Sequence, residues 1–116
     1  MGTIKNYTDV SQSNKLARIL PLESADMYLD IDYDVHAQKY KYHLMTMDDQ
    51  FDDVCIPCWS LAALLGVLPN YKLSSEHNCH TCTVETSFGK ETVGWFDSPI
   101  DACVAMIEKL HELRLF

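Results

Sequence analysis

No stretch of this sequence is apolar for long enough to span a membrane. The longest apolar run, from Trp59 to Leu68, covers about half of the roughly 20 residues that a membrane helix needs. The first residues, MGTIKN, also lack the apolar segment of a secretion signal. We therefore expect a cytoplasmic protein that does not enter a membrane.

Basic residues are scarce as well. Nine Lys and Arg stand against seventeen Asp and Glu, which gives a net charge of -8 at pH 7. A protein with this balance repels phosphate backbones, so we expect no nucleic-acid partner. A protein partner with a basic surface fits the charge better.

The sequence motifs of common enzyme classes are missing. The chain has no G-x-S-x-G nucleophile elbow, no P-loop, no G-x-G-x-x-G fingerprint and no H-E-x-x-H helix. A catalytic triad assembled from distant residues would leave no such trace. We therefore expect a non-enzymatic accessory or interaction domain, while the sequence indicates neither its process, its partner nor its oligomeric state.

The chain has enough apolar residues for a core of its own. At 116 residues and 47% hydrophobic content, we expect a single domain over residues 1–116. The order of elements is helix, two strands, helix, two or three strands, helix. This order predicts an α+β fold in which an antiparallel sheet made of two hairpins packs with two or three helices.

Capping signals mark the first two helices. Asp9 and Gln12 have the spacing of a capping box, and Pro21 ends the helix that follows. The second helix is expected to begin around Pro57 and to be buried, because it is apolar nearly all round. We place Trp59 in the core.

The last helix has the clearest pattern. Ser98 is its expected cap, and Pro99 suits its first position. Apolar residues then recur at helical spacing and should form its buried face: Ile100, Cys103, Val104, Ile107 and Leu110.

Period-two alternation predicts an antiparallel hairpin before the second helix. Charge and hydrophobicity agree on one register, which pairs Asp34 with Lys39, Asp32 with Lys41 and Asp30 with His43. The opposite face, which includes the pairs Leu29–Leu44 and Ile31–Tyr42, is expected to face the core. A second hairpin is expected around Phe88-Gly89-Lys90, with strands His80–Ser87 and Glu91–Phe96. A short strand over Tyr71–Leu73 would precede it.

The five cysteines include two Cys-x-x-Cys pairs separated by twenty residues. This spacing falls within that of two-knuckle zinc sites. The alternative function is therefore a zinc-stabilised module with zinc as cofactor and four ligands, Cys55, Cys58, Cys79 and Cys82. A strand that starts at His80 would instead point Cys79 and Cys82 to opposite faces. We expect four separate reduced thiols, with Cys82 turned inward, and no cofactor.

A third hypothesis is a thiol redox protein that uses Cys55 and Cys58. A Cys-x-x-Cys at a helix N-terminus has a lowered thiol pKa, which favours thiolate chemistry. The acidic residues before Cys55, including Asp52 and Asp53, would raise that pKa.

Three stretches resemble a known group of sequences: "QSNKLARILPLESADMYL", "IPCWSLAALLGVLP" and "FDSPIDACVAMIEKLHEL". Together they resemble a family of small uncharacterised proteins from gut Bacteroidetes and their prophages or mobile elements. The resemblance spans most of the chain, and Trp59, Ser60 and the following leucines mark the second stretch. Because that family has no established activity, the resemblance implies no catalytic residue.

Overall fold

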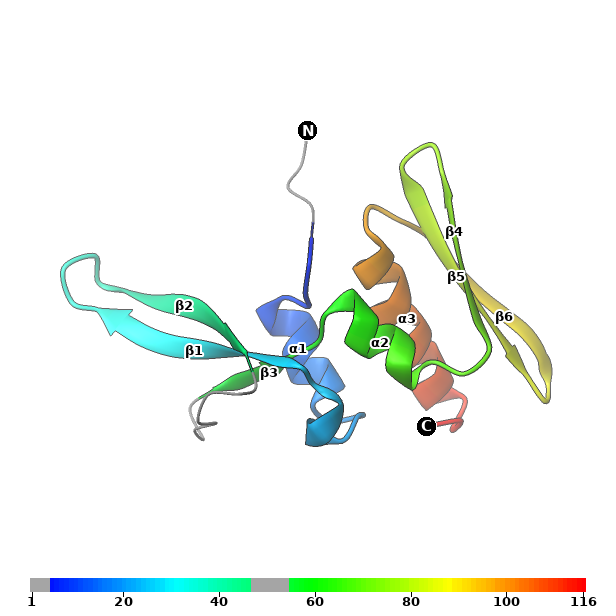
Figure 1. The fold of residues 1–116 in the computed structure, drawn as a ribbon, viewed down its shortest axis with the longest axis horizontal. Coiled ribbons are helices and arrows are strands. Elements are labelled where there is room, and N and C mark those ends of the chain that lie inside the picture. The colour runs from blue at the N-terminus through cyan, green and yellow to red at the C-terminus, as the bar shows by residue number, and fades with distance from the viewer. Residues whose placement is uncertain (1–4, 47–54) are drawn as a thin grey trace.

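The computed structural model describes residues 5–46 and 55–116. Three α-helices lie in the middle of the molecule, with a three-stranded antiparallel sheet on either side (Figure 1). The longest dimension is 52 Å, because one hairpin extends away from the helices. The expected α+β class is confirmed.

Helix α1 (Val10–Leu16) begins at the predicted capping box. The Asp9 carboxylate accepts from the Gln12 amide at 2.7 Å, and the Gln12 side chain accepts from the Asp9 amide at 3.1 Å. These reciprocal bonds satisfy amides that the first turn leaves without helical partners. The helix ends before Pro21, and a short 3-10 helix, η1 (Leu22–Ser24), leads into the first sheet.

The first sheet has the strand order β2-β1-β3, with β1 at Met27–Asp34, β2 at Lys39–Thr46 and β3 at Ile56–Cys58. The predicted register of the first hairpin is confirmed for the whole ladder, including the pairs Asp34–Lys39, Asp32–Lys41 and Asp30–His43.

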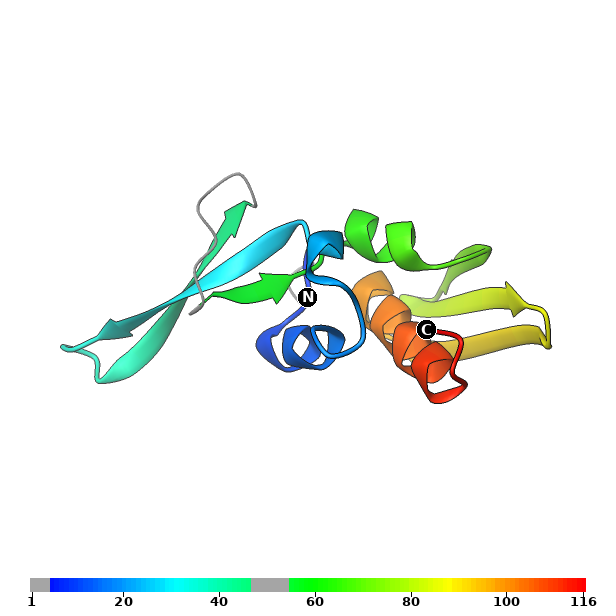
Figure 2. The ribbon, with the colours of Figure 1, turned by 90° about the horizontal axis from the view of Figure 1, so that it is seen from below.

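The prediction that one face of this hairpin is buried throughout is wrong. Leu29 is buried, but Tyr33, Tyr40 and Leu44 on the same face are exposed, and Tyr28 on the other face is buried. The reason is the length of the hairpin, which continues past the helices (Figure 2). Among the described side chains of the hairpin, only Tyr28 and Leu29 at its base are buried. The other pair predicted to face the core, Ile31–Tyr42, lies outside the side chains that the structure describes.

The predicted start of the second helix is also wrong. Pro57 lies in β3, where residues 56–58 pair with residues 27–29 of β1. This is an edge strand, a position that tolerates a proline because its missing amide is not needed by a further neighbour. Helix α2 (Leu61–Val67) begins later, where the Ser60 hydroxyl accepts from the Ala63 amide. It is only partly buried, with Leu64 inward.

The second sheet has the order β4-β5-β6, with β4 at Tyr71–Glu76, β5 at Cys79–Thr86 and β6 at Gly89–Phe96. His77 and Asn78 form the first turn with φ of 51° and 63°, as a two-residue type I′ turn requires. The second hairpin is confirmed, although Gly89, at φ 121°, already belongs to β6 and the turn lies at residues 87–88.

Helix α3 (Pro99–Glu112) holds the core together. The Ser98 hydroxyl caps it by accepting from the Asp101 amide at 3.1 Å, as predicted. Its buried face packs against β5, β6 and α2 and comprises Ile100, Ala102, Cys103, Val104, Met106, Ile107 and Leu110. The predicted core positions of this helix are therefore confirmed.

Trp59 links the N-terminal segment to the core. Its side chain is fully buried, and its indole Nε1–H donates to the Ser24 hydroxyl at 2.9 Å. Its backbone exchanges two bonds with Thr8: the Thr8 amide donates to the Trp59 carbonyl, and the Trp59 amide donates to the Thr8 hydroxyl. The prediction that Trp59 is a core residue is confirmed.

The two tryptophans provide a matched test of this core. Trp59→Ala should lower the free energy of unfolding by roughly 3–5 kcal/mol, because a fully buried ring is lost. Trp95→Ala, at a side chain that is 69% exposed, should change it by less than about 0.5 kcal/mol. Urea titrations of both variants measure the difference, and equal losses would contradict the assignment.

Candidate functional site

The two Cys-x-x-Cys pairs lie in different sheets. Cys58 ends β3 of the first sheet, directly after Pro57, and both Cys79 and Cys82 lie on β5 of the second. A strand rises about 3.3 Å per residue, so cysteines three residues apart along it have Cα atoms about 10 Å apart. That exceeds the roughly 7 Å limit for a disulfide and is too far for two thiolates to share one zinc ion in a tight knuckle.

The residues that the structure describes contain no cluster of three or more His, Cys, Asp or Glu side chains suited to a metal ion. All four cysteines of the zinc hypothesis, Cys55, Cys58, Cys79 and Cys82, are among these residues, and their thiols are free. The structure thus does not bring the four proposed ligands together. Cys82 is buried and turned inward on β5, as predicted.

The redox hypothesis required Cys55 and Cys58 to lie at a helix N-terminus. In the structure Cys55 directly precedes β3, and Cys58 is the last residue of that strand. Cys58 is buried, with its sulfur 3.5 Å from the Ser13 hydroxyl. Burial raises the pKa of its thiol, although the bond from Ser13 opposes this. Cys55 is half-buried, and its sulfur lies 3.9 Å from an Asp30 carboxylate oxygen. A protonated, buried thiol packs in the core and does not attack as a nucleophile.

The sequence did not reveal that Cys82 has a thiol neighbour. Cys103, on the buried face of α3, is close enough to share a hydrogen bond with it. This bond and burial both raise the pKa of the Cys103 thiol. Helical spacing had already put Cys103 on the buried face, but only the packing of α3 on β5 decides which residue it meets.

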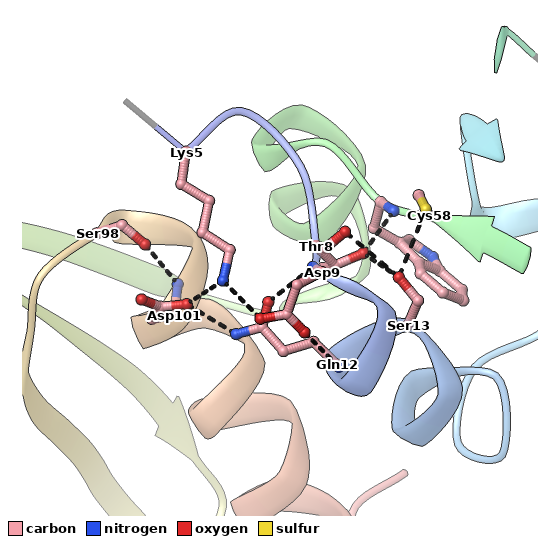
Figure 3. Close-up of polar contacts among 9 residues, drawn as sticks. Lys5, Thr8, Asp9, Gln12, Ser13, Cys58, Ser98 and Asp101 are labelled. Carbon is pink, nitrogen blue, oxygen red and sulfur yellow. Dashed lines mark hydrogen bonds and ion pairs between the residues drawn. The ribbon is translucent and has the colours of Figure 1, made fainter. Parts of the chain in front are cut away.

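A polar cluster joins the N-terminal segment, α1 and α3 (Figure 3). The Lys5 ammonium group lies 2.7 Å from Asp101 and 3.2 Å from Asp9, and the Gln12 amide donates to the same Asp101 oxygen at 2.7 Å. Burial opposes ionisation of Asp101, but the bonds from Lys5 and Gln12 and the charge of Lys5 hold its pKa below the usual value. The cluster forms a structural clasp in which each group has a partner.

Beside this clasp lies a fully buried pair of hydroxyl groups. Thr8 and Ser13 are hydrogen-bonded at 2.8 Å, and Thr8 also accepts from the Trp59 amide (Figure 3). No described buried side-chain nitrogen or oxygen lacks a hydrogen-bond partner. The hydroxyls of Thr8 and Ser13 are therefore used within the fold.

An open cleft of about 360 Å³ lies between the ends of α1 and α3. Its lining mixes both signs of charge: Lys15, Arg18, Ile19, Glu108, His111 and Glu112. Lys15 already faces Glu108 at 3.8 Å. Long, half-exposed side chains that neutralise each other do not define a ligand, so this cleft is a weak candidate.

The strongest candidate is an exposed apolar surface on the first hairpin, which we call the hairpin patch: Tyr33, Val35, Tyr40 and Leu44. Tyr33 and Tyr40 are 50% and 63% exposed, and their rings meet edge to face with centroids 5.1 Å apart. Val35, at the start of the turn, is 73% exposed. The Asp34 carboxylate holds this turn by accepting from the amides of His36 and Ala37. The patch is therefore a preformed surface on a paired element.

The clasp should make the free energy of unfolding depend on pH. Because the pKa of Asp101 is lower in the folded than in the unfolded chain, its carboxylate stabilises the fold above about pH 4. This stabilisation is lost as the pH falls through the folded-state pKa of Asp101. Asp101→Asn should thus cost about 1 kcal/mol at neutral pH and nothing in strong acid. Urea titrations across pH measure this, with Glu23→Gln, at an exposed residue, as the control. A loss that is constant with pH would contradict it.

The cysteine geometry predicts the result of metal removal. Protein purified without added metal should contain no stoichiometric zinc, and a strong chelator should leave its melting temperature unchanged. A structural zinc site contributes on the order of 10 kcal/mol, so its removal would be obvious. One zinc per chain by mass spectrometry, together with a collapse of the melting temperature, would restore the four-cysteine site.

Comparison with known proteins adds no functional assignment to this geometry. No protein-family model, curated protein or solved structure matches the chain. The resemblance to small proteins of gut Bacteroidetes therefore stays a prediction. Among the described residues, no helix is long and apolar enough to cross a membrane.

Proposed function

We propose that this chain is a non-enzymatic interaction module that binds a protein partner with a basic surface through the hairpin patch. The observation that carries the proposal is the exposure of Tyr33 and Tyr40 on a hairpin that extends beyond the helices (Figure 1). A strand pair that contributed only to the core would end where the helices end.

Tyrosine pairs suit an interface for physical reasons. Each ring offers a large apolar area at the cost of ordering only two side-chain torsions, and its hydroxyl satisfies polar neighbours. Contact between Tyr33 and Tyr40 orders both rings before binding, so less conformational entropy is lost on association. Aromatic residues of this kind dominate binding energy in many interfaces.

The net charge of the sequence segment that contains the hairpin supports a basic partner. Residues 26–53 contain eight aspartates and two lysines, so they carry -6 of the chain's net charge of -8. A segment with this net charge attracts a cationic surface and repels an anionic one. This arrangement also argues against nucleic acid as the ligand.

The non-enzymatic role, the location and the origin that we expect from the sequence are part of the same proposal. A non-enzymatic role agrees with polar clusters whose members are all hydrogen-bonded within the fold. Free thiols suit the reducing cytoplasm, where we place the protein. The resemblance stated above would add an origin in a prophage or another mobile element.

Peptides displayed on phage and selected against the folded chain would test the proposal. Selected peptides should be rich in Lys and Arg beside apolar residues, and their binding should weaken as salt is raised. The double variant Tyr33→Ser/Tyr40→Ser should lose at least about tenfold in affinity for a synthetic peptide of that kind, measured by calorimetry.

The far side of the molecule supplies a matched control. Phe88→Ser and Trp95→Ser remove aromatic rings of similar exposure from β6 and the turn before it. They should leave peptide affinity unchanged. Peptides without basic residues, or a loss caused by Trp95→Ser and not by the tyrosine pair, would show that the hairpin patch is not the binding surface.

A further inference from the structure

Strand β4 is an edge strand with nothing paired to its outer side in the described part of the chain. Five of its six residues are exposed. The described part of the chain has three other sheet edges. Strand β2 is the outer strand of the first hairpin and carries Tyr40 and Leu44 of the hairpin patch, which is assigned above to a different partner. Strand β3 is three residues long and contains Pro57, and β6 is interrupted by a register shift opposite residues 80–82 of β5. Strand β4 has neither interruption.

The backbone groups that face this open edge can be identified. The Asn70 carbonyl accepts from the Glu85 amide of β5 at 3.3 Å, so even-numbered residues bond toward β5. Hydrogen bonding alternates along an antiparallel ladder. The amides and carbonyls of Tyr71, Leu73 and Ser75 therefore point to the open edge.

The side chains on one face of β4 are self-complementary. Lys72 and Glu76 lie on either side of Ser74, two residues away in each direction, and Leu73 on the other face is opposite the buried Cys82. When two copies of β4 run antiparallel with Ser74 on the two-fold axis, Lys72 of each copy is opposite Glu76 of the other. The same register pairs Leu73 with Ser75, which both direct their backbone groups outward.

We propose that β4 forms a two-fold symmetric dimer with β4 of a second copy of this chain, which joins the two sheets into one of six strands. Such an interface is isologous, so each favourable contact occurs twice. A lysine on an edge strand usually discourages pairing. Here the second copy places Glu76 opposite it, and within one copy the Glu76 carboxylate lies 3.8 Å from the exposed His77 imidazole.

The size of the interface limits its strength. Pairing along six residues buries less area than the roughly 1,200 Å² of a stable complex, so the dimer should form in the micromolar range or above. The first hairpin lies across the helices from the second sheet and remains uncovered in both copies (Figure 1). The dimer would therefore present two hairpin patches and bind a repetitive partner more tightly than one copy can.

Sedimentation velocity of the full chain, from low micromolar to several hundred micromolar, tests the dimer. The mass should rise from monomer toward dimer with concentration. Lys72→Glu and Glu76→Lys each place like charges opposite one another at two symmetric positions, and each should weaken the dimer by about tenfold. The double variant K72E/E76K restores opposite charges and should dimerise like the natural chain.

Lys90→Glu is the matched control, because it makes the same change of charge on the opposite edge, in β6. It should leave dimerisation unchanged. Circular dichroism and thermal melts of every variant identify any that fail to fold. A chain that stays monomeric at the highest concentration would overturn the proposal, and so would a double variant no better than either single one.

Hydrogen exchange tests the register without any substitution. The amides of Tyr71, Leu73 and Ser75 should become more protected as concentration rises, while amides of the β6 edge should not change. Protection that appears on β6 or on the first hairpin would overturn the assignment to β4. Peptide binding by the hairpin patch is measured separately on dilute monomer, so either proposal can fail without the other.

Discussion

Burial of helix α3 is the constraint on which the rest of the structure depends. Seven of its fourteen residues are buried, and it packs against two strands and both other helices. Side chains such as Met106 and Ile107 have no water contact at all. Burial of this much apolar surface is the dominant favourable term in folding. The second sheet packs on α3, and the first sheet joins the core through the contact of β3 with α1 and through Trp59, which directly follows β3.

This arrangement divides the molecule into a packed half and an extended half. The packed half holds the core, and its polar contacts, such as that between Lys5 and Asp101, fasten the N-terminal segment to α3. The extended half is the hairpin, which gains its stability from backbone pairing and from the contact between Tyr33 and Tyr40. Because the core does not use the outer hairpin, its apolar side chains are available to a partner. The sequence segment 26–53, which includes this hairpin, carries -6 of the net charge of -8.

The cysteines show how spacing can suggest a site that the backbone does not make. A Cys-x-x-Cys pair binds zinc or cycles as a disulfide only where a turn or helix brings its sulfurs together. In this chain Cys79 and Cys82 lie on a strand that separates them, and Cys58 ends another. Burial and the contact between Cys82 and Cys103 then make these thiols part of the core.

The sequence by itself determined the features that depend on neighbours along the chain. The caps at Asp9 and Ser98, the buried face of α3 and the register of the first hairpin follow from local hydrogen bonds and from periodicity, which act over a few residues. Only the tertiary structure decided that residues 56–58 join β1 as a strand, because a three-residue segment has no periodicity and takes its conformation from the edge it meets. It also decided that the outer hairpin stays exposed: alternation shows that a strand has two different faces, but whether anything covers the apolar one depends on how far the helices extend.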